Sequence, residues 1–557
     1  MHDPQVMYVA GRSPIPDQSE YEIMFVTTAV DEEEATSQAT TTFGFKINQP
    51  PEYLKGATGL IKDIALRSGV DMDRCYFTAV CKWLLPRMKR SKPSVKVLKW
   101  GLPILMDEIR RTKPKIVVCM GKHAFDLLSD RKIGFNDAHG GWFWSTEANA
   151  HLYLMHTPGA LIGKPELHET FRVDFTEIKR KKDILDGNDI GAIPWKFEVI
   201  RDEQTLRDWV SRMEDEGNTL FSVDCEWHGR THVEGKLRTI QFAWNESEAI
   251  VVEFRDEQTE WSFELDDDPG DDKGRYAAVG AILGSYLNNP NTRYIGHHFS
   301  ADSPWMEHWL GLNTYRRCVM DTEFAQQAID ESSELGLERG IAMKYTTLGL
   351  YCLDLVLWKK ENPKLVTEGY GYIPSDILHP YGALDVITPF RAYPMLVRQL
   401  EAQNLKVYHD TILLPFVSDV FTAFAMLGLP MDVKLMDELR ELFHFAKGQL
   451  EVKFRERMHR EARAHLMNKL AAELPDTGVM LAARAIRAGS IDAALAIIKP
   501  AVPMETIPKW IHLVTHLYDS PVFNIRSNDH MRRWLFEVEE LTPVKSTNQK
   551  AKGVILQ

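Results

Sequence analysis

Cysteine is scarce in this chain, and its sequence has no mark of export or of a membrane span. The six cysteines are scattered singly over 557 residues: Cys75, Cys81, Cys119, Cys225, Cys318 and Cys352. This scatter predicts neither disulfides nor a structural zinc site. No run approaches the roughly 20 uninterrupted apolar residues of a membrane helix, and the N-terminus lacks the charged-then-apolar order of a secretion signal. We therefore expect a cytoplasmic protein without a membrane partner.

An excess of basic charge is also missing. The formal net charge is −13, so any contact with nucleic acid must come from local patches. One basic patch runs from Lys82 to Lys115, with eleven Lys or Arg against two acids. The residues in it that we expect to contact phosphates are Lys82, Arg87, Lys89, Arg90 and Lys92. A solvated surface stretch is an equally good interpretation of this patch.

Apolar patterning divides the chain into three expected domains. Residues 1–185 alternate apolar runs with amphipathic stretches, which predicts an α/β layer domain. Residues 179–194 have the composition of a linker. Four apolar segments, 220–223, 237–243, 249–253 and 293–297, predict the strands of a mixed α/β domain over residues 186–400. Residues 401–557 have the periodicity of helices almost throughout.

Two acids stand one residue apart in the middle domain, in the segment FSVDCEW. The two-residue period of a strand places Asp224 and Glu226 on one face. Neighbouring carboxylates repel each other unless a cation joins them, and hard oxygen ligands suit Mg²⁺ or Mn²⁺. A pair of this kind alone is common on protein surfaces, so its interpretation depends on the motifs that follow.

Two further acidic motifs follow in order. Asp302 comes just after the strand-like segment RYIGHH, and HPYGALDVITPF places Tyr381 and Asp385 four residues apart, on one face of a helix. With these motifs, residues 200–395 resemble the DEDD superfamily of 3′→5′ exonucleases, in the branch with a tyrosine in the third motif. The resemblance implies a ribonuclease H-like fold.

The resemblance also implies roles for these residues. Asp224, Glu226, Asp302 and Asp385 would hold two divalent metal ions, Mg²⁺ or Mn²⁺, and Tyr381 would orient the attacking water. Where the second motif usually begins with Asn, this chain has His298, which leaves the metal ligand intact. Asp321 resembles a recurrent acid of these domains, and we expect a supporting role; a helix N-cap is an equally good interpretation.

The C-terminal part resembles the approach and thumb of family A DNA polymerases. The carrying segments are LPFVSDVFTAFAMLGLPMDVKLMDEL and VFNIRSNDHMRRWLFEVEELTPVKSTNQKAKG. The family's palm and fingers motifs do not occur, so we expect the polymerase centre to require a second polypeptide or a longer chain. Ile525, Trp534, Leu535 and Phe536 would anchor the segment 522–557 on that partner, or complete the thumb's own core.

The N-terminal part resembles the uracil-DNA glycosylase superfamily, nearest family 4, over residues 20–180. The carrying segments are KGATGLIKDIALRSGVDMDRCYFTAVCKW, EIRRTKPKIVVCMGKHAFDLL and HTPGALI. The family's working residues are replaced: the water-positioning motif reads TTAVD, and Thr157 stands one position after His156. Trp83 and Trp100 stand where iron–sulfur cysteines would be expected. We therefore expect an inactive glycosylase-like domain without an iron–sulfur cluster.

Taken together, these resemblances predict the proofreading portion of a virus-like replicative family A polymerase, acting on primer-template or single-stranded DNA. If the source is viral, the expected location is the host cytoplasm. Two alternatives stay open: an RNA-trimming nuclease of the RNase D type, and a non-catalytic scaffold that binds DNA in a replisome.

Overall fold

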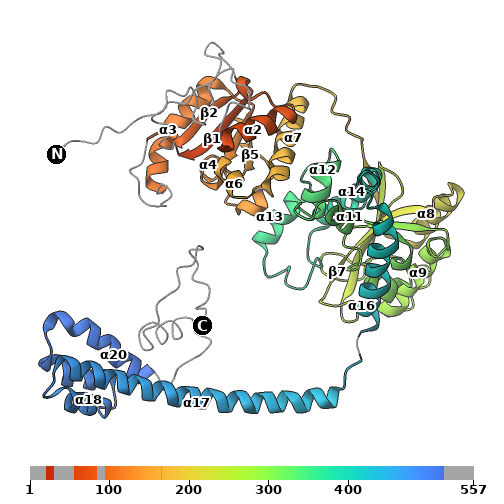
Figure 1. The fold of residues 1–557 in the computed structure, drawn as a ribbon. Coiled ribbons are helices and arrows are strands. Elements are labelled where there is room, and N and C mark those ends of the chain that lie inside the picture. The colour runs from red at the N-terminus through yellow and green to blue at the C-terminus, as the bar shows by residue number, and fades with distance from the viewer. Residues whose placement is uncertain (1–20, 30–55, 84–94, 165, 429, 520–557) are drawn as a thin grey trace. The chain divides into compact units, whose positions relative to one another are not determined.

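The computed structural model describes residues 21–29, 56–83, 95–164, 166–428 and 430–519. The chain forms two compact units, residues 1–428 and 429–557. The first contains an α/β layer domain and a mixed-sheet, ribonuclease H-like domain, and the second is helical (Figure 1). This confirms the predicted fold class. The expectations for Arg87, Lys89, Arg90, Lys92 and residues 522–557 fall outside the described residues.

Five strands form the sheet of the α/β layer domain, in the order β2-β1-β3-β5-β4. They are β1 (Ile23–Ala29), β2 (Tyr76–Cys81), β3 (Ile116–Met120), β4 (Trp142–Ser145) and β5 (Ala150–Met155). All pair in parallel except β4, which runs antiparallel to β5. Helices cover both faces, and for that reason β2 and β3 are apolar along nearly their whole length.

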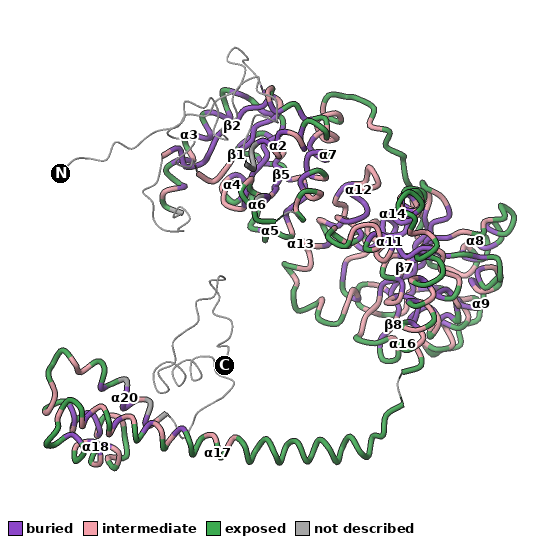
Figure 2. Tube along the Cα trace, in the orientation of Figure 1, coloured by how far each residue is buried: buried purple, intermediate pink, exposed green. Residues whose placement is uncertain are grey.

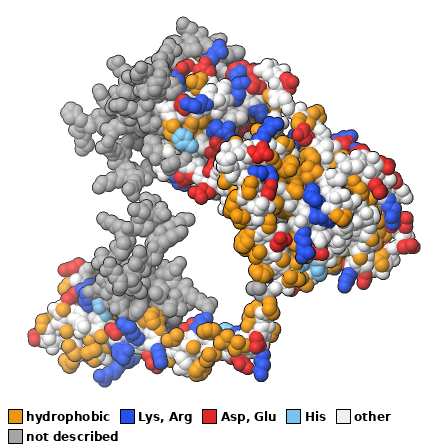
Figure 3. All heavy atoms as spheres, turned by 45° about the vertical axis from the view of Figure 1, so that its right-hand side comes forward, with side chains coloured by type: hydrophobic (Ala, Val, Ile, Leu, Met, Phe, Trp, Pro, Cys, Tyr) orange, Lys and Arg blue, Asp and Glu red, His pale blue; other side chains and the backbone are white. Residues whose placement is uncertain are grey.

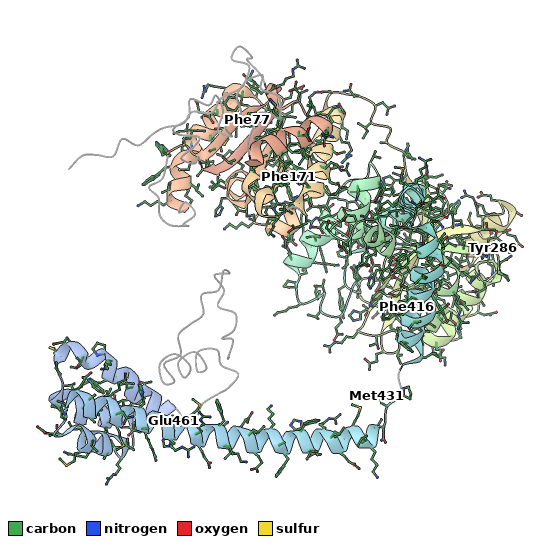
Figure 4. All side chains as sticks on the ribbon, viewed as in Figure 1. Phe77, Phe171, Tyr286, Phe416, Met431 and Glu461 are labelled. Atoms are coloured by element: carbon green, nitrogen blue, oxygen red, sulfur yellow. The ribbon has the colours of Figure 1, made fainter. Side chains whose placement is uncertain are left out.

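Two apolar cores lie on the two faces of this sheet. One packs the strands against α3 (Val95–Thr112) and α4 (Lys122–Leu128). The other packs them against α2 (Gly56–Arg67) and α7 (Leu167–Leu185), and contains Phe77 and Phe171, labelled in Figure 4. Three short helices connect these elements: η2 (Met72–Arg74), α5 (Phe135–Ala138) and α6 (Pro158–Gly163).

Helix α7 continues farther than its composition suggests. Residues 179–185, expected to be linker, are helical, and the irregular segment is 186–195. Ion pairs between Lys179 and Asp183 and between Lys182 and Asp186 stabilise the last turns. Leu185 also packs against the apolar core of the sheet. This packing stabilises the last turns of the helix, although most of their residues are polar.

The second sheet has six strands in the order β11-β10-β7-β8-β9-β6. They are β6 (Lys196–Ile200), β7 (Leu220–His228), β8 (Lys236–Ala243), β9 (Glu248–Glu253), β10 (Arg293–Gly296) and β11 (Cys318–Asp321). Strands β7, β8 and β9 form an antiparallel meander, whereas β6 is parallel to β9, and β10 is parallel to β7 and β11. The sheet is therefore mixed, and β7 is one of its central strands.

Helices cover both faces of this second sheet as well. One face packs on α8 (Glu203–Asp215), α9 (Asp272–Leu287) and α10 (Ser303–Leu310). The opposite face packs on α14 (Ser375–Ala402). The segment between β11 and α14 contains α11 (Thr322–Ile329), η4 (Leu337–Ala342), α12 (Met343–Tyr345) and α13 (Leu353–Glu361), and η3 (Tyr315–Arg317) precedes β11.

A helical run with an apolar exposed face closes the first unit. It joins α15 (Lys406–Tyr408), η5 (His409–Leu413), η6 (Phe416–Thr422) and α16 (Ala423–Leu427). His409, Val417 and Thr422 are buried, whereas Ile412, Phe416, Phe421, Phe424 and Leu427 are exposed. Phe416 is labelled in Figure 4, and hydrophobic side chains gather on this part of the first unit in Figure 3.

By length and composition, the run Lys406–Leu427 could cross a membrane, which the sequence analysis did not anticipate. Its mean hydropathy is 1.5, and 17% of the window is buried. It is the one such helix in the described part of the chain, and helices of soluble proteins meet the same criterion. The run belongs to the first compact unit, although residues 401–557 were expected to form one helical region.

The second unit is built on one long helix, α17 (Val433–Glu473), whose first turn is capped by Asp432. Its C-terminal part packs on α18 (Gly478–Ile486), α19 (Ile491–Ile498) and α20 (Ile507–Asp519) around the buried Trp510. Two single turns, η7 (Lys499–Ala501) and η8 (Met504–Thr506), link the last two helices. The first half of α17 is exposed along its length (Figure 2).

Candidate active site

Strand β7 and helix α14 bring three carboxylates together. Asp224 and Glu226 lie on the same face of β7, opposite Gln241 and Thr239 of β8. Asp385 comes from the middle of α14, which crosses that face. One carboxylate oxygen from each of the three acids lies within 4.8 Å of the others. The structure therefore joins residues that are far apart in the sequence.

Asp302 lies next to Cys225 of β7. It occupies the N-cap position of α10, just after β10. Its Oδ1 atom accepts a weak hydrogen bond from Cys225 Sγ at 3.6 Å. It stands outside the 4.8 Å group of Asp224, Glu226 and Asp385, but its charge acts on both β7 acids.

The pKa values of these acids are raised. Burial raises the pKa of Asp224 and Glu226, and neighbouring carboxylates, Asp302 for Asp224 and Asp224 for Glu226, raise it further. The pKa of Asp385 is raised by burial and then by Asp224, and burial raises the pKa of Asp302 to about 8. The cause is that charges of one sign are crowded where little water can screen them.

Two tyrosines hydrogen-bond to Asp385. Tyr381 lies one helical turn before it on α14 and donates to its carboxylate. Tyr351 donates from its hydroxyl to Asp385 Oδ1 at 2.5 Å. The sequence spacing identified Tyr381 but not Tyr351, because Tyr351 lies in an irregular segment where no periodicity tells which side chains point inward.

Asp321 supports the turn that carries the second motif. Its side chain caps α11 by accepting from Glu323 N, and it also accepts from the backbone N–H of His298 at 3.1 Å and of Phe299 at 2.8 Å. Burial raises its pKa to about 6. Both interpretations of Asp321 from the sequence thus describe part of its environment.

His298 has a left-handed backbone, with φ +51°. Asn, Asp and His are enriched in that conformation, which accounts for His where the resembled motif has Asn. Its Nδ1 atom is 2.5 Å from Glu323 Oε2. The hydrogen bond to Glu323 raises the pKa of His298.

Three more groups, Lys359, Tyr370 and Glu338, interact with the acids of the centre and were not predicted from the sequence. Lys359 of α13 lies over the ring of Tyr370, with Nζ 3.8 Å from the ring centroid. Glu338 of η4 acts electrostatically on Asp224 and Asp385. None of the three stands at a motif spacing, so no signal in the sequence marks them.

The donor set fits a divalent cation. Carboxylate oxygens from Asp224, Glu226 and Asp385 are hard ligands at distances that one ion could bridge. These carboxylates repel each other, and this repulsion contributes to their raised pKa values. A bound cation would reduce the repulsion.

The glycosylase-like domain brings a different set of residues to its strand ends. Thr28 is the penultimate residue of β1, Gly121 directly follows β3, and Thr157 lies two residues after β5. A Cβ atom on Gly121, at φ +104°, would lie 2.9 Å from Thr157 Cγ2, so these strand ends are closely packed. The ring of His156 lies 4.6 Å from Phe135 and 5.1 Å from His139, centroid to centroid.

The structure corrects the expectation for Lys82. Its side chain is fully buried, and Nζ forms an ion pair with Glu108 Oε2 at 2.7 Å and donates to the carbonyl of Ala79. An interior lysine in this arrangement cannot contact a DNA phosphate. Of the two tryptophans singled out, Trp83 packs against the domain core, and Trp100 is exposed beside Lys96.

The fold and the acidic centre define a nuclease-type α/β domain, and comparison with protein families is consistent with this. Residues 197–401 match the family model DNA_pol_A_exo1, described as a 3'-5' exonuclease, and residues 9–177 match the model of the Uracil DNA glycosylase superfamily. The chain therefore carries a 3′–5′ exonuclease domain and a domain of the uracil DNA glycosylase superfamily. None of the curated proteins matches the chain.

Several solved structures are similar at low identity. Brucella melitensis NrnC with bound Mg²⁺ is 13% identical over 42% of this chain and 95% of that chain, with a TM-score of 0.28. The catalytic core of RRP6 from Trypanosoma brucei is 13% identical over 58% and 80%, with a TM-score of 0.28. The POL domain of Pol1 from M. smegmatis, in complex with DNA primer-template and dNTP, is 13% identical over 59% and 48%, with a TM-score of 0.30.

Proposed function

We propose that this protein is a metal-dependent 3′→5′ exonuclease that removes nucleotides from DNA ends, as the proofreading portion of a family A DNA polymerase. The observation that carries the proposal is the meeting of Asp224 and Glu226 from β7 with Asp385 from α14, within 4.8 Å. The exonuclease family match over residues 197–401 supports it.

In this proposal Asp224, Glu226, Asp302 and Asp385 hold two Mg²⁺ or Mn²⁺ ions. When bound, the ions supply positive charge that stabilises the phosphate as negative charge develops on it. Tyr381 positions the attacking water through its hydroxyl, which its hydrogen bond to Asp385 orients. A bond forms between the water oxygen and phosphorus, the bond from phosphorus to O3′ breaks, and O3′ takes up a proton. The product is a nucleoside 5′-monophosphate.

The polymerase context is part of the same proposal. The resemblance of residues 401–557 to the approach and thumb of a family A polymerase supports it. The palm and fingers that complete a polymerase centre would lie outside these 557 residues, in the same or a second polypeptide. The glycosylase-like domain would have kept its fold without its reaction, and the protein would act in the cytoplasm of its cell or host.

The test is digestion of a 5′-labelled primer-template with a mismatched 3′ end, with and without Mg²⁺, beside an RNA strand of the same sequence. We expect Mg²⁺-dependent shortening of the DNA from its 3′ end, faster on the mismatched than on the matched end, because a paired terminus must first be unstacked. Faster digestion of RNA would favour the RNase D-type alternative. No digestion of either would favour the scaffold.

The acids are tested by the double substitution Asp224→Ala with Glu226→Ala. We expect the rate to fall by at least about 100-fold, because the remaining acids cannot hold the ions that stabilise the reacting phosphate. A matched control is Asp208→Ala with Glu214→Ala, which removes two exposed acids of α8 and should leave the rate unchanged. Wild-type rates in the first variant would refute the assignment.

A further inference from the structure

A lysine beside the carboxylate centre has no role in the function proposed above. Lys359 lies on α13, and its Nζ is 3.8 Å from the centroid of the Tyr370 ring. The Tyr370 ring stacks in turn near Tyr381, with 6.4 Å between centroids and 19° between planes. Because Tyr381 is one turn from Asp385 on α14, this row of side chains leads from Lys359 to the acidic centre.

The charge of Lys359 acts on the acids of the centre. Its ammonium lowers the pKa of Glu226, against the larger effects that raise it. In return, Glu226, Glu338 and Asp385 act to raise the pKa of Lys359, although burial lowers it overall. These effects on each other's pKa show that the ammonium and the carboxylates interact electrostatically.

The ammonium is nevertheless not engaged by a carboxylate. Among the described residues, no acidic oxygen lies within 4.0 Å of Lys359 Nζ to form an ion pair. Its neighbour Lys360 forms one with Asp137, and Lys344 forms one with Glu169. A lysine held over an aromatic face keeps N–H donors that can bind another anion.

Helix α13 is held firmly enough to fix this lysine. Its Leu353 and Leu357 pack against the apolar core of the glycosylase-like domain. Next to Lys359, Lys360 forms a partly exposed ion pair with Asp137 of α5. Lys359 and Lys360 thus point to different partners, one toward the acidic centre and one toward the neighbouring domain.

We propose that Lys359 is a further catalytic residue, whose ammonium binds a non-bridging oxygen of the scissile phosphate. This inference rests on the proposed exonuclease function. The phosphate would lie between the cation-binding acids and Lys359, so that positive charge faces it from two sides. As water attacks and the bond to O3′ breaks, Lys359 would stabilise the negative charge that develops on the phosphoryl oxygens.

The experiment compares wild type, Lys359→Met and the matched control Lys360→Met at saturating Mg²⁺. We expect kcat of Lys359→Met to fall by about 100-fold, with no increase in the Mg²⁺ concentration needed for half-maximal rate. Loss of a cation near the acids does not weaken metal binding, whereas loss of a ligand does. Lys360→Met should stay within about twofold of wild type, because an exposed ion pair contributes little.

A binding measurement separates contact with phosphate from a purely structural role. We expect the affinity for dTMP in Mg²⁺ to fall by about tenfold in Lys359→Met, equivalent to one lost charged contact, with the affinity for thymidine unchanged. Lys359→Arg, which keeps the charge, should recover part of the rate.

Two results overturn the inference: a Lys359→Met rate near that of wild type at saturating Mg²⁺, or an equal loss of affinity for dTMP and thymidine. If wild type itself digests nothing, the proposed function fails, and the role of Lys359 fails with it. Active wild type with an equally active Lys359→Met variant rejects the role of Lys359 alone.

Discussion

His298 and Glu323 form an ion pair next to the turn that carries Asp302, and the two groups shift each other's pKa in opposite directions. The pair raises the pKa of His298 above its usual 6.5 and lowers the pKa of Glu323 below 4.5. The stabilisation from His298 is complete below pH 6.5 and is lost as pH rises through its folded-state pKa. The stabilisation from Glu323 is complete above pH 4.5 and is lost as pH falls. The pair therefore stabilises the fold most between pH 4.5 and 6.5.

We expect His298→Ala to destabilise the protein more at pH 5.5 than at pH 8.5. Because the His298 side chain is 55% exposed, the difference in unfolding free energy should be about 0.5 kcal/mol. Thermal unfolding of both proteins at the two pH values measures it. In a Glu323→Gln background the effect of His298→Ala should no longer depend on pH. If that dependence persists, another titrating group causes it.

Most site residues that the sequence predicted stand at fixed spacings on one element, and Asp302 was predicted from its place after a strand-like segment. Asp224 and Glu226 follow the period of a strand, and Tyr381 and Asp385 that of a helix. Tyr351 could not be predicted because it lies in an irregular segment without periodicity, and Lys359 could not because its helix α13 has no motif spacing to the acids. Lys82 was misinterpreted because composition counts a basic residue without showing that it pairs with Glu108 in the interior.

Among the secondary-structure elements, α9 and α10 show how closely the scaffold fits the site. A Cβ atom on Gly280 of α9 would lie 2.2 Å from the carbonyl oxygen of Leu310, where α10 ends. No flexible side chain can give way there, since the clash is with backbone. Asp302 lies at the other end of α10, so a shift of this helix would move its carboxylate.

We expect Gly280→Ala to destabilise the first unit by about 1–3 kcal/mol, because α10 must shift to admit the methyl group. The same shift should weaken the site's affinity for Mg²⁺ by moving Asp302. Chemical unfolding and metal titration measure the two effects. Gly448→Ala is the opposite control: nothing lies within 4 Å of the added Cβ in α17, so it should stabilise that helix by about 0.5–1 kcal/mol.

Strands were easier to predict than helix ends. The four strand segments expected in the exonuclease domain correspond to β7, β8, β9 and β10, because buried strands are apolar along their length. The end of α7 was misplaced, since its last turns are polar and are stabilised by ion pairs and by packing of Leu185. The helices of Lys406–Leu427 were expected, but their high mean hydropathy was overlooked because charged residues such as Asp410 and Asp419 interrupt the apolar run.

At the scale of the whole molecule, two α/β domains of the first unit place functional groups at strand ends in different ways. In the exonuclease domain acids converge from β7, α10 and α14. In the glycosylase-like domain the strand ends carry Thr28 and Thr157, and burial lowers the pKa of the adjacent His156. Thr157 stands where the resembled glycosylase motif has its histidine, so no imidazole occupies that position to stabilise a departing uracil anion.

We therefore expect no release of uracil from uracil-containing DNA. The assay is formation of abasic sites, followed by alkaline cleavage of the strand. It is best run with the Asp224→Ala, Glu226→Ala variant, so that digestion from the 3′ end does not consume the substrate. Abasic sites above background would show that the glycosylase-like domain has kept its reaction.

Helix α17 combines two environments in one continuous element of 41 residues, about 60 Å long. From Met458 onward it packs in the helical core, whereas Leu442 and Phe443 are 58% and 68% exposed. An unsupported helix in water is only marginally stable. Its first half should therefore unfold and refold locally while the second half stays helical.

Amide hydrogens of residues 433–457 should exchange with deuterium much faster than those of residues 462–470. Mass spectrometry of peptides after exchange would measure the difference. Equal protection of both halves would mean that another surface covers the first half in solution.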